Sequence, residues 1–194
     1  MIDEQSLPPR LALDLDAHFE EFVRAFQDRL YAFALRLTLS PPDAEEALQD
    51  AFVRAYRALQ RYPSERIASL RLRAWMYQIV LNVVRNRVRR PTLSADPLED
   101  THASGLASRA RDEQPEHETL AMEVRGELAT ALRKLPERYA TAVILRHVQG
   151  LAYAEVADVL QQPVGTTKSD VHRGLRLLRE ALEPELELMG EHIR

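Results

Sequence analysis

Large apolar side chains recur at every third or fourth position through most of the chain, a spacing that predicts α-helices rather than β-strands. The first such stripe predicts an amphipathic helix over residues 11–39, with Asp14 or Asp16 in position to cap its start. Ser40 and two prolines then end this helix, because proline cannot continue one. The apolar positions of the stripe are Phe19, Phe22, Phe26, Leu30, Phe33 and Leu37.

Two further helices complete the first block. Residues 43–62 have an apolar face made largely of alanine, and their first turns hold acids that complement the positive end of the helix dipole. A short irregular or single-turn piece is predicted over residues 65–70, followed by a helix over residues 72–90 with two adjacent apolar rows. Because the three helices share an aromatic and aliphatic interior, we predict a helical domain over residues 11–90, preceded by a tail over residues 1–10.

The composition changes over residues 91–117, which are rich in small and polar residues, with acids in excess of bases. Such a segment cannot bury enough apolar surface to offset its ordering entropy, so it is predicted to be a flexible linker. Helical spacing returns over residues 118–182, where Pro136 opens one helix and a break at 161–163 separates the last two. Two helices joined by a short turn form a helix-turn-helix. Residues 183–194 are assigned to a C-terminal tail.

The predicted fold is therefore all-α, with two small helical domains joined by a flexible linker. A length of 194 residues and a hydrophobic fraction of 45% are sufficient for two such cores. No apolar run approaches the roughly 20 residues of a membrane span, and the acidic first residues differ from a signal peptide. We therefore expect a cytoplasmic protein without membrane insertion. The absence of cysteine excludes disulfides, thiolate zinc sites and a cysteine nucleophile.

Positive charge is concentrated in one segment of this otherwise acidic chain. The formal net charge is −4, yet no Asp or Glu occurs between Glu65 and Asp96. That segment holds many arginines together with Trp75, Asn82 and Asn86. Arginine neutralises phosphates, whereas amide and aromatic groups can contact unpaired bases. The segment indicates a nucleic-acid-binding face, and an ordinary solvated cationic face is the alternative.

The last predicted helix has a polar and basic outer face. Short polar groups near its start could reach base edges in the major groove, and the basic groups behind them could reach phosphates. Helical hairpins are common in all-α proteins, so this pattern alone is weak evidence for DNA binding. The arginine-rich segment on the same chain strengthens that interpretation. The outer face consists of Thr166, Lys168, Ser169, His172, Arg173, Arg176 and Arg179, whereas Val164, Thr167, Val171, Leu175 and Leu178 are predicted to face inward.

The sequence argues against an enzyme. The string GTTKS at residues 165–169 lacks the upstream glycine and the Gly-Lys pair of a phosphate-binding loop. No His-Glu-x-x-His or Gly-x-Ser-x-Gly motif occurs, and the six histidines lack metal-ligand spacing. We predict no catalytic residues, no metal site and no cofactor.

Three segments together resemble the sigma factors of RNA polymerase, specifically the extracytoplasmic-function (ECF) group built from regions 2 and 4. They are DAEEALQDAFVRAYRAL (43–59), WMYQIVLNVVRNRVRR (75–90) and LPERYATAVILRHVQGLAYAEVADVLQQPVGTTKSDVHRGLRLLREAL (135–182). They follow the order of the family, with its linker between them. The resemblance implies a protein that binds core polymerase, directs it to specific promoters and promotes melting of the −10 element.

The resemblance also implies three sets of contact residues, with Asn82 near a captured −10 base and Trp75 more a core residue than a stacking platform. The set implied for core polymerase is Asp43, Glu45, Glu46, Gln49, Asp50 and Arg54. The set implied for the −10 element is Trp75, Asn82, Arg85, Asn86, Arg87, Arg89 and Arg90. The set implied for the −35 element is Thr166, Thr167, Lys168, Ser169, Asp170, His172, Arg173 and Arg176.

Three positions depart from the family pattern. Ala152 stands where a serine commonly caps a helix, so about 1 kcal/mol of capping is expected to be missing. Gln161 replaces a small turn residue, which makes a left-handed turn conformation costlier. Asp170 stands where arginine is common, and could accept a bond from a cytosine amino group or pair with Arg173.

A dimeric helix-turn-helix repressor or activator is the alternative function. It would use the first block for dimerisation or ligand binding and would favour a palindromic site. If the sigma-factor interpretation holds, an anti-sigma factor is a candidate partner beside core polymerase and promoter DNA. Such a partner is expected to cover the arginine-rich face or the helix over residues 43–62.

Overall fold

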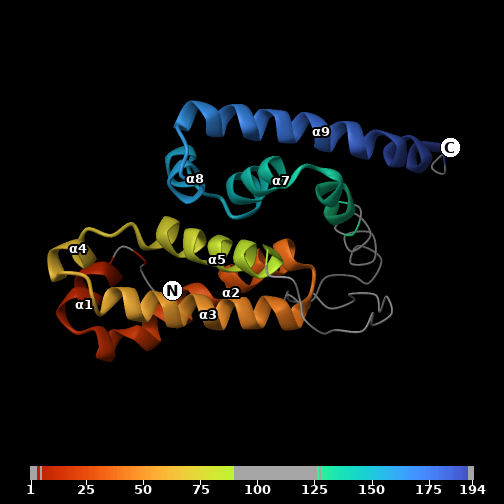
Figure 1. Ribbon diagram of the computed structural model, residues 1–194. Coiled ribbons are helices and arrows are strands. Elements are labelled where there is room, and N and C mark those ends of the chain that lie inside the picture. The colour runs from red at the N-terminus through yellow and green to blue at the C-terminus, as the bar shows by residue number, and fades with distance from the viewer. Residues whose placement is uncertain (1–3, 5, 90–125, 127, 192–194) are drawn as a thin grey trace. The chain divides into compact units, whose positions relative to one another are not determined.

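The computed structural model describes residue 4, residues 6–89, residue 126 and residues 128–191, with side chains placed up to residue 87 and from residue 126 to residue 183. The regular structure among these residues is helical, and no strand occurs among them (Figure 1). This confirms the all-α class with two helical parts. Among the described helices, none combines the length and apolar character needed to cross a membrane. The residues predicted to form the linker lie outside the described ranges.

The described helices fall into two compact units, and their boundary crosses α8, which we describe with the second unit because that helix is continuous. The first unit contains α1 (Leu7–Leu13), α2 (Leu15–Thr38), α3 (Pro41–Leu59), α4 (Ser64–Ala68) and α5 (Leu72–Arg89). The second contains α7 (Glu137–Val143), the π-helical turn η1 (Ile144–Val148), α8 (Tyr153–Leu160) and α9 (Val164–Glu191).

Helix α1 begins inside the segment expected to be an N-terminal tail. Leu7 and Leu11 are buried, and α1 packs against α2 and α4. Asp14 separates α1 from α2 because its backbone is extended, at φ −149° and ψ 100°. Its side chain accepts a hydrogen bond from the Ala17 N–H at 3.0 Å, which confirms Asp14 as a cap. The single helix predicted over residues 11–39 is therefore two helices.

Helix α3 packs against α2 and α5 through its alanine face. Ser40 caps α3 by accepting a bond from the Asp43 N–H, and the two prolines occupy the first helical positions. Methyl side chains allow the α3 backbone to lie close to its neighbours, and phenylalanines of α2 fill the space beside them. The fully buried alanines are Ala44, Ala47, Ala51 and Ala55, and the aromatic contacts join Phe19, Phe22, Phe26, Phe52 and Tyr56.

Helix α5 presents a broader core face than its sequence pattern indicated. Tyr77 is buried and makes an edge contact with Phe33, with the ring centroids 5.1 Å apart. Burial raises the pKa of Tyr77 to about 12. In contrast, Trp75 and Ile79 on the same helix are only partly buried. The buried face consists of Leu72, Ala74, Met76, Tyr77, Val80, Leu81, Val83 and Val84.

The second unit places α7 against α9 around a small apolar cluster. The buried members of the cluster are Ala131, Leu135, Val143 and Leu178. Pro136 stands immediately before α7, so the predicted helix start is shifted by one position. Gly174 permits the closest approach, because a Cβ atom there would lie 2.6 Å from Cγ2 of Val143 and 3.0 Å from the carbonyl oxygen of Tyr139.

The turn between α8 and α9 has the strained geometry anticipated at Gln161, whose φ is 52°. At the other end of α8, the missing serine cap is partly compensated. The Glu155 carboxylate accepts a bond from the Ala152 N–H at 2.7 Å, which supplies half of a capping box. Ala152 cannot supply the other half, because it has no side-chain acceptor.

We expect Gln161→Gly to raise the stability of the second unit by about 0.5 to 1 kcal/mol. A left-handed residue other than glycine costs roughly 1 to 2 kcal/mol, and glycine removes this cost. Part of the gain is offset because glycine loses more backbone entropy on folding than other residues do. Segment-resolved hydrogen exchange of residues 153–171 measures the change. Gln161→Ala is the control, because alanine shares the left-handed penalty. Equal protection in both variants would contradict the assignment of strain to this backbone angle.

Candidate functional site

The six residues predicted to contact core polymerase lie on α3, at positions before and between the buried alanines of its core face. Asp50 is half-buried and the other five side chains are exposed. The exposed members are Asp43, Glu45, Glu46, Gln49 and Arg54. Val53, with 47% of its surface exposed, lies on the same helix and adds an apolar group.

Helix α5 brings only part of the predicted −10 set onto one face. Asn82 and Asn86 are exposed one turn apart, and Arg85 is partly exposed between them. Arg89 is at the last position of α5, and Arg90 lies outside the described residues. The amides and Arg85 therefore form a polar strip opposite a helix face that is committed to the core.

Arg87 has a different environment from the rest of the −10 set. Its Nη1 lies 2.8 Å from Oε2 of Glu46 and its Nη2 lies 2.9 Å from Oδ2 of Asp50. We call these three residues the Arg87 cluster. The hydrogen bond from Arg87 lowers the pKa of Glu46, and the two carboxylates raise the pKa of Arg87. The cluster joins the predicted polymerase face to the predicted DNA face, a contact that was not anticipated.

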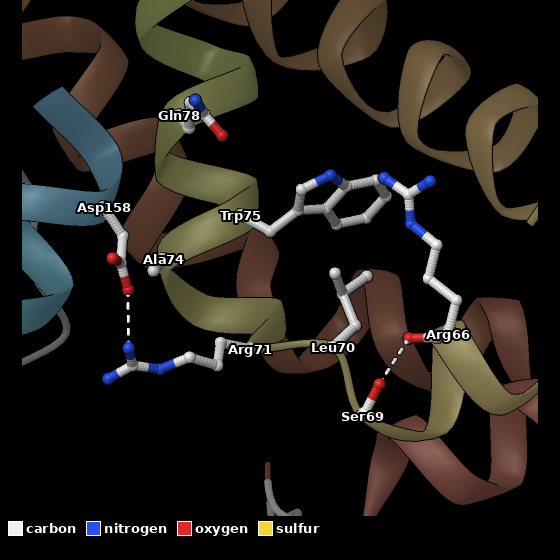
Figure 2. A pocket seen from close by; sticks show the side chains of 8 residues that line it. All are labelled: Arg66, Ser69, Leu70, Arg71, Ala74, Trp75, Gln78 and Asp158. Carbon is white, nitrogen blue, oxygen red and sulfur yellow. Dashed lines mark hydrogen bonds and ion pairs between the residues drawn. The ribbon is translucent and has the colours of Figure 1, made fainter. Parts of the chain in front are cut away.

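Trp75 is a partly exposed residue beside other aromatic and cationic groups. Its ring centroid is 6.2 Å from that of Tyr62, and the Arg66 guanidinium carbon lies 3.7 Å from the Tyr62 ring centroid. Figure 2 shows the indole pointing from α5 toward Arg66, with Leu70 next to it. Tyr62 was not grouped with Arg66 and Trp75 from the sequence, because it lies between α3 and α4, outside the arginine-rich segment.

Helix α9 exposes most of the residues predicted to contact the −35 element. Thr166 is half-buried at the start of the helix, and Ser169 donates to the carbonyl oxygen of Gly165 at 3.1 Å. Thr167 is fully buried, and its hydroxyl donates to the carbonyl oxygen of Pro163 at 3.2 Å. The exposed members of the set are Lys168, Ser169, His172, Arg173 and Arg176.

Asp170 is also buried, with 1% of its surface exposed, and it anchors α9 to two other segments. Its Oδ2 accepts bonds from Nε of Arg138 at 2.7 Å and from Nε2 of Gln162 at 3.0 Å. The hydrogen bond to Asp170 raises the pKa of Arg138. The ion-pair partner of Asp170 is therefore Arg138 on α7, rather than the Arg173 considered from the sequence. Thr167 and Asp170 connect elements of the second unit instead of facing outward.

No group of three or more His, Asp or Glu residues suited to a metal ion occurs in the part of the chain that the structure describes. The polar faces of α3, α5 and α9 instead present charged, amide and hydroxyl groups on helix surfaces. Such groups can bind phosphates, base edges and oppositely charged protein surfaces.

Comparison with known families matches both blocks. Residues 22–92 match the family described as "Sigma-70 region 2", and residues 125–178 match "Sigma-70, region 4". The RNA polymerase sigma-H factor of Pseudomonas aeruginosa is 30% identical over 188 residues, covering 94% of this chain and 95% of that protein. The ECF RNA polymerase sigma factor SigW of Bacillus subtilis is 29% identical over 176 residues, covering 87% of this chain and 90% of that protein.

Solved structures support the same fold. CnrH, solved in complex with the cytosolic domain of CnrY, is 21% identical with a TM-score of 0.67 and covers 93% of this chain and 97% of its own. The sigma factor RpoE of Bartonella quintana, solved with the anti-sigma factor NepR, is 20% identical with a TM-score of 0.61 and covers 85% of this chain and 96% of its own.

Both regions thus occur in the expected order, and the similarity extends over nearly the full length of a relative. This selects transcription initiation over the dimeric regulator and over any enzyme. The chain belongs to the ECF group of RNA polymerase sigma factors, with sigma-70 regions 2 and 4.

Proposed function

We propose that this sigma factor acts in the cytoplasm and that three of its helix faces each bind a different partner. The outward side of α3 binds core polymerase, α5 holds the opened −10 strand, and α9 reads the −35 duplex. The observation that carries the proposal is the exposed strip of Asn82, Arg85 and Asn86 on a helix whose other side is core. An amide and arginine strip fits a single strand with exposed bases and phosphates.

The polymerase face is proposed on α3 because its exposed residues combine carboxylates, an amide and an apolar group. Glu45 and Gln49 project from consecutive turns, and Val53 continues the same line. An apolar group with a charged surround is typical of a protein interface. A cationic surface on core polymerase would complement the acids of this face.

For the −10 element, we assign Asn82 to a base and Arg85 with Asn86 to the strand around it. The exposed amide of Asn82 can both donate and accept, as base recognition requires. A flipped or unpaired base costs a few kcal/mol to expose, and contacts of about 1 to 3 kcal/mol per base offset that cost. Trp75 is added as a neighbouring stacking surface, since part of it is exposed.

For the −35 element, the proposed contacts are those that α9 exposes near its start. Thr166, Lys168 and Ser169 are closest to the N-terminal end, where recognition helices contact base edges. His172, Arg173 and Arg176 follow along the helix and suit phosphates. Thr167 and Asp170 are proposed to position this helix, because both are buried.

An anti-sigma factor is also proposed as a partner. The solved complex of RpoE with the anti-sigma factor NepR shows such a partner for one protein of this fold, and CnrH was also solved with a protein partner, the cytosolic domain of CnrY. A partner that covers α3 or the polar strip of α5 would exclude core polymerase or the −10 strand. Competition between a candidate partner and core polymerase for the full chain tests this proposal, and simultaneous binding without loss of transcription would contradict it.

Run-off transcription tests the central assignment. We expect Asn82→Ala combined with Arg85→Ala to reduce polymerase-dependent starts at least about tenfold, because a base contact of about 1 to 3 kcal/mol and a phosphate contact are lost together. The assay uses core polymerase, the full chain and a fragmented genomic library, so that the starts also reveal the promoter elements.

The matched control for this assay is Gln27→Ala combined with Arg24→Ala, which removes one side-chain amide and one arginine from exposed positions of α2. Transcription should be retained in the control. A similar loss in both double variants would contradict the assignment of the −10 strand to α5. An absence of polymerase-dependent starts with the unmodified chain would contradict the proposed function itself.

A further inference from the structure

The Arg87 cluster lies where two proposed surfaces meet, and the inference drawn from it rests on the proposed function of those surfaces. Glu46 and Asp50 belong to the polymerase face of α3, whereas Arg87 belongs to the predicted −10 set of α5. The positions are far apart in sequence, because Arg87 follows Asp50 by 37 positions along the chain. One ion-pair cluster therefore involves the groups that two different ligands would use.

The terminal nitrogens of Arg87 are already engaged. Nη1 contacts Glu46 at 2.8 Å and Nη2 contacts Asp50 at 2.9 Å. A guanidinium binds a phosphate through the same fork of donors that it uses for carboxylates. Of its five N–H donors, Nε is buried and has no hydrogen-bond partner. A phosphate that binds both terminal nitrogens in the direction now taken by Glu46 and Asp50 must therefore displace these two carboxylates.

The two carboxylates are more accessible than the arginine between them. The side chain of Glu46 is 66% exposed and that of Asp50 is 47% exposed, compared with 27% for Arg87. A cationic group can reach these acids from outside without unfolding α3. The Arg87 cluster holds two carboxylates and one guanidinium, so its net negative charge also repels a phosphate that approaches this end of α5.

We propose that the Arg87 cluster is an exchange site that couples core-polymerase binding to −10 strand binding. A cationic side chain of core polymerase takes the place of Arg87 on Glu46 and Asp50, and the released guanidinium binds a phosphate of the opened strand. One cation enters the carboxylate pair as another leaves it, so both acids stay paired. Because binding linkage is reciprocal, the strand strengthens polymerase binding by the same factor.

The test begins with the full chain in the absence of polymerase. The probe is a fluorescent single strand that carries the −10 region of a promoter mapped by run-off transcription. We expect Glu46→Gln combined with Asp50→Asn to raise the affinity of the chain for this strand about 5-fold or more. Coupling between two binding sites in one protein typically changes affinity by roughly 5- to 150-fold. The plot of log K against log salt should steepen by about 0.7, since one more phosphate is contacted.

Asp43→Asn combined with Glu45→Gln is the matched control. These residues carry the same charge on the same helix but lie outside the Arg87 cluster. Their removal should raise strand affinity less and leave the salt slope unchanged. Equal effects of the two pairs would overturn the proposal, because net charge alone would then explain the gain.

Arg87→Gln tests whether the arginine itself is the group that is released. It should have little effect on strand binding by the free chain. In the Glu46→Gln, Asp50→Asn background it should cancel the gain in strand affinity. It should also weaken strand binding by the chain assembled with core polymerase. If Arg87→Gln had the same effect on strand affinity in the free chain, in the Glu46→Gln, Asp50→Asn background and in the assembly with core polymerase, the exchange would be overturned. Circular dichroism melting verifies that each variant is folded.

The same measurements separate this inference from the proposed function. If Asn82→Ala with Arg85→Ala weakens strand binding by the assembled complex, α5 is the strand-binding helix whether or not exchange occurs. If that double variant has no effect, the assignment of α5 fails. If it has an effect but the acids and Arg87 act independently, only the exchange fails.

Discussion

Asp170→Ala is expected to lower the opening free energy of α7 and of the first turns of α9 by about 2 to 3 kcal/mol, because a buried carboxylate with charge-assisted bonds is removed and its donors lose their acceptor. Asp170 is 1% exposed and bonds Arg138 and Gln162. Segment-resolved hydrogen exchange of the full chain measures the change in residues 137–143 and 164–171, where local opening can be separated from the first unit.

Glu180→Ala is the control for this prediction. Glu180 lies on the same helix, and its carboxylate is 3.6 Å from Nε of Arg176 in an exposed pair. Exposed pairs contribute about 0 to 1 kcal/mol, so the control should have a small effect. If the two substitutions changed exchange equally, burial of Asp170 would not be the source of its contribution.

Gly174→Ala is expected to destabilise the second unit by about 1 to 2 kcal/mol, although alanine is the better helix former by about 1 kcal/mol. The new Cβ would lie 2.6 Å from a methyl group of Val143 and 3.0 Å from the Tyr139 carbonyl oxygen. A β-branched side chain has few alternative rotamers, and a carbonyl moves only with its helix, so α7 and α9 would have to separate. Hydrogen exchange of α7 measures the loss.

Gly165→Ala on the same helix is the control, and it is not expected to lower stability. A Cβ atom at position 165 meets nothing within 4 Å, so the gain in helix propensity is not opposed. We expect it to leave stability unchanged or raise it by up to about 1 kcal/mol. A destabilising effect of equal size at both positions would show that contact with α7 is not what makes position 174 sensitive.

Local sequence rules predicted the helices and several of their ends. Asp14 is a cap because its short acceptor reaches the next turn, which depends only on nearby residues. The left-handed conformation of Gln161 was anticipated from the family pattern, in which a small turn residue is usual at this position. The start of α1 was missed because Leu7 is followed by two prolines, which read as an irregular tail but occupy the first turn of a helix.

The site was predicted less completely, for two different reasons. Asp170 was placed in the −35 set by the family resemblance, because arginine is common at this position in the family. Its spacing from the inward Thr167 and Val171 was not used, although residues three positions apart share a helix face. The partnership of Arg87 with Glu46 could not be predicted, since it depends on how α3 and α5 pack. Spacing along one helix carries no information about a neighbouring helix.

The π-helical turn η1 has a consequence for how this family can change in length. The N–H of Gln149 bonds the carbonyl oxygen of Ile144, five residues earlier, whereas an α-helix would use four. The segment therefore contains one residue more than a regular helix of the same rise. If one residue between 144 and 148 were deleted, the π-helical turn could become a regular α-helical turn. The helices on either side would then keep their packing contacts. Natural length variation in region 4 is thus expected to concentrate at this turn, and not within α7 or α9.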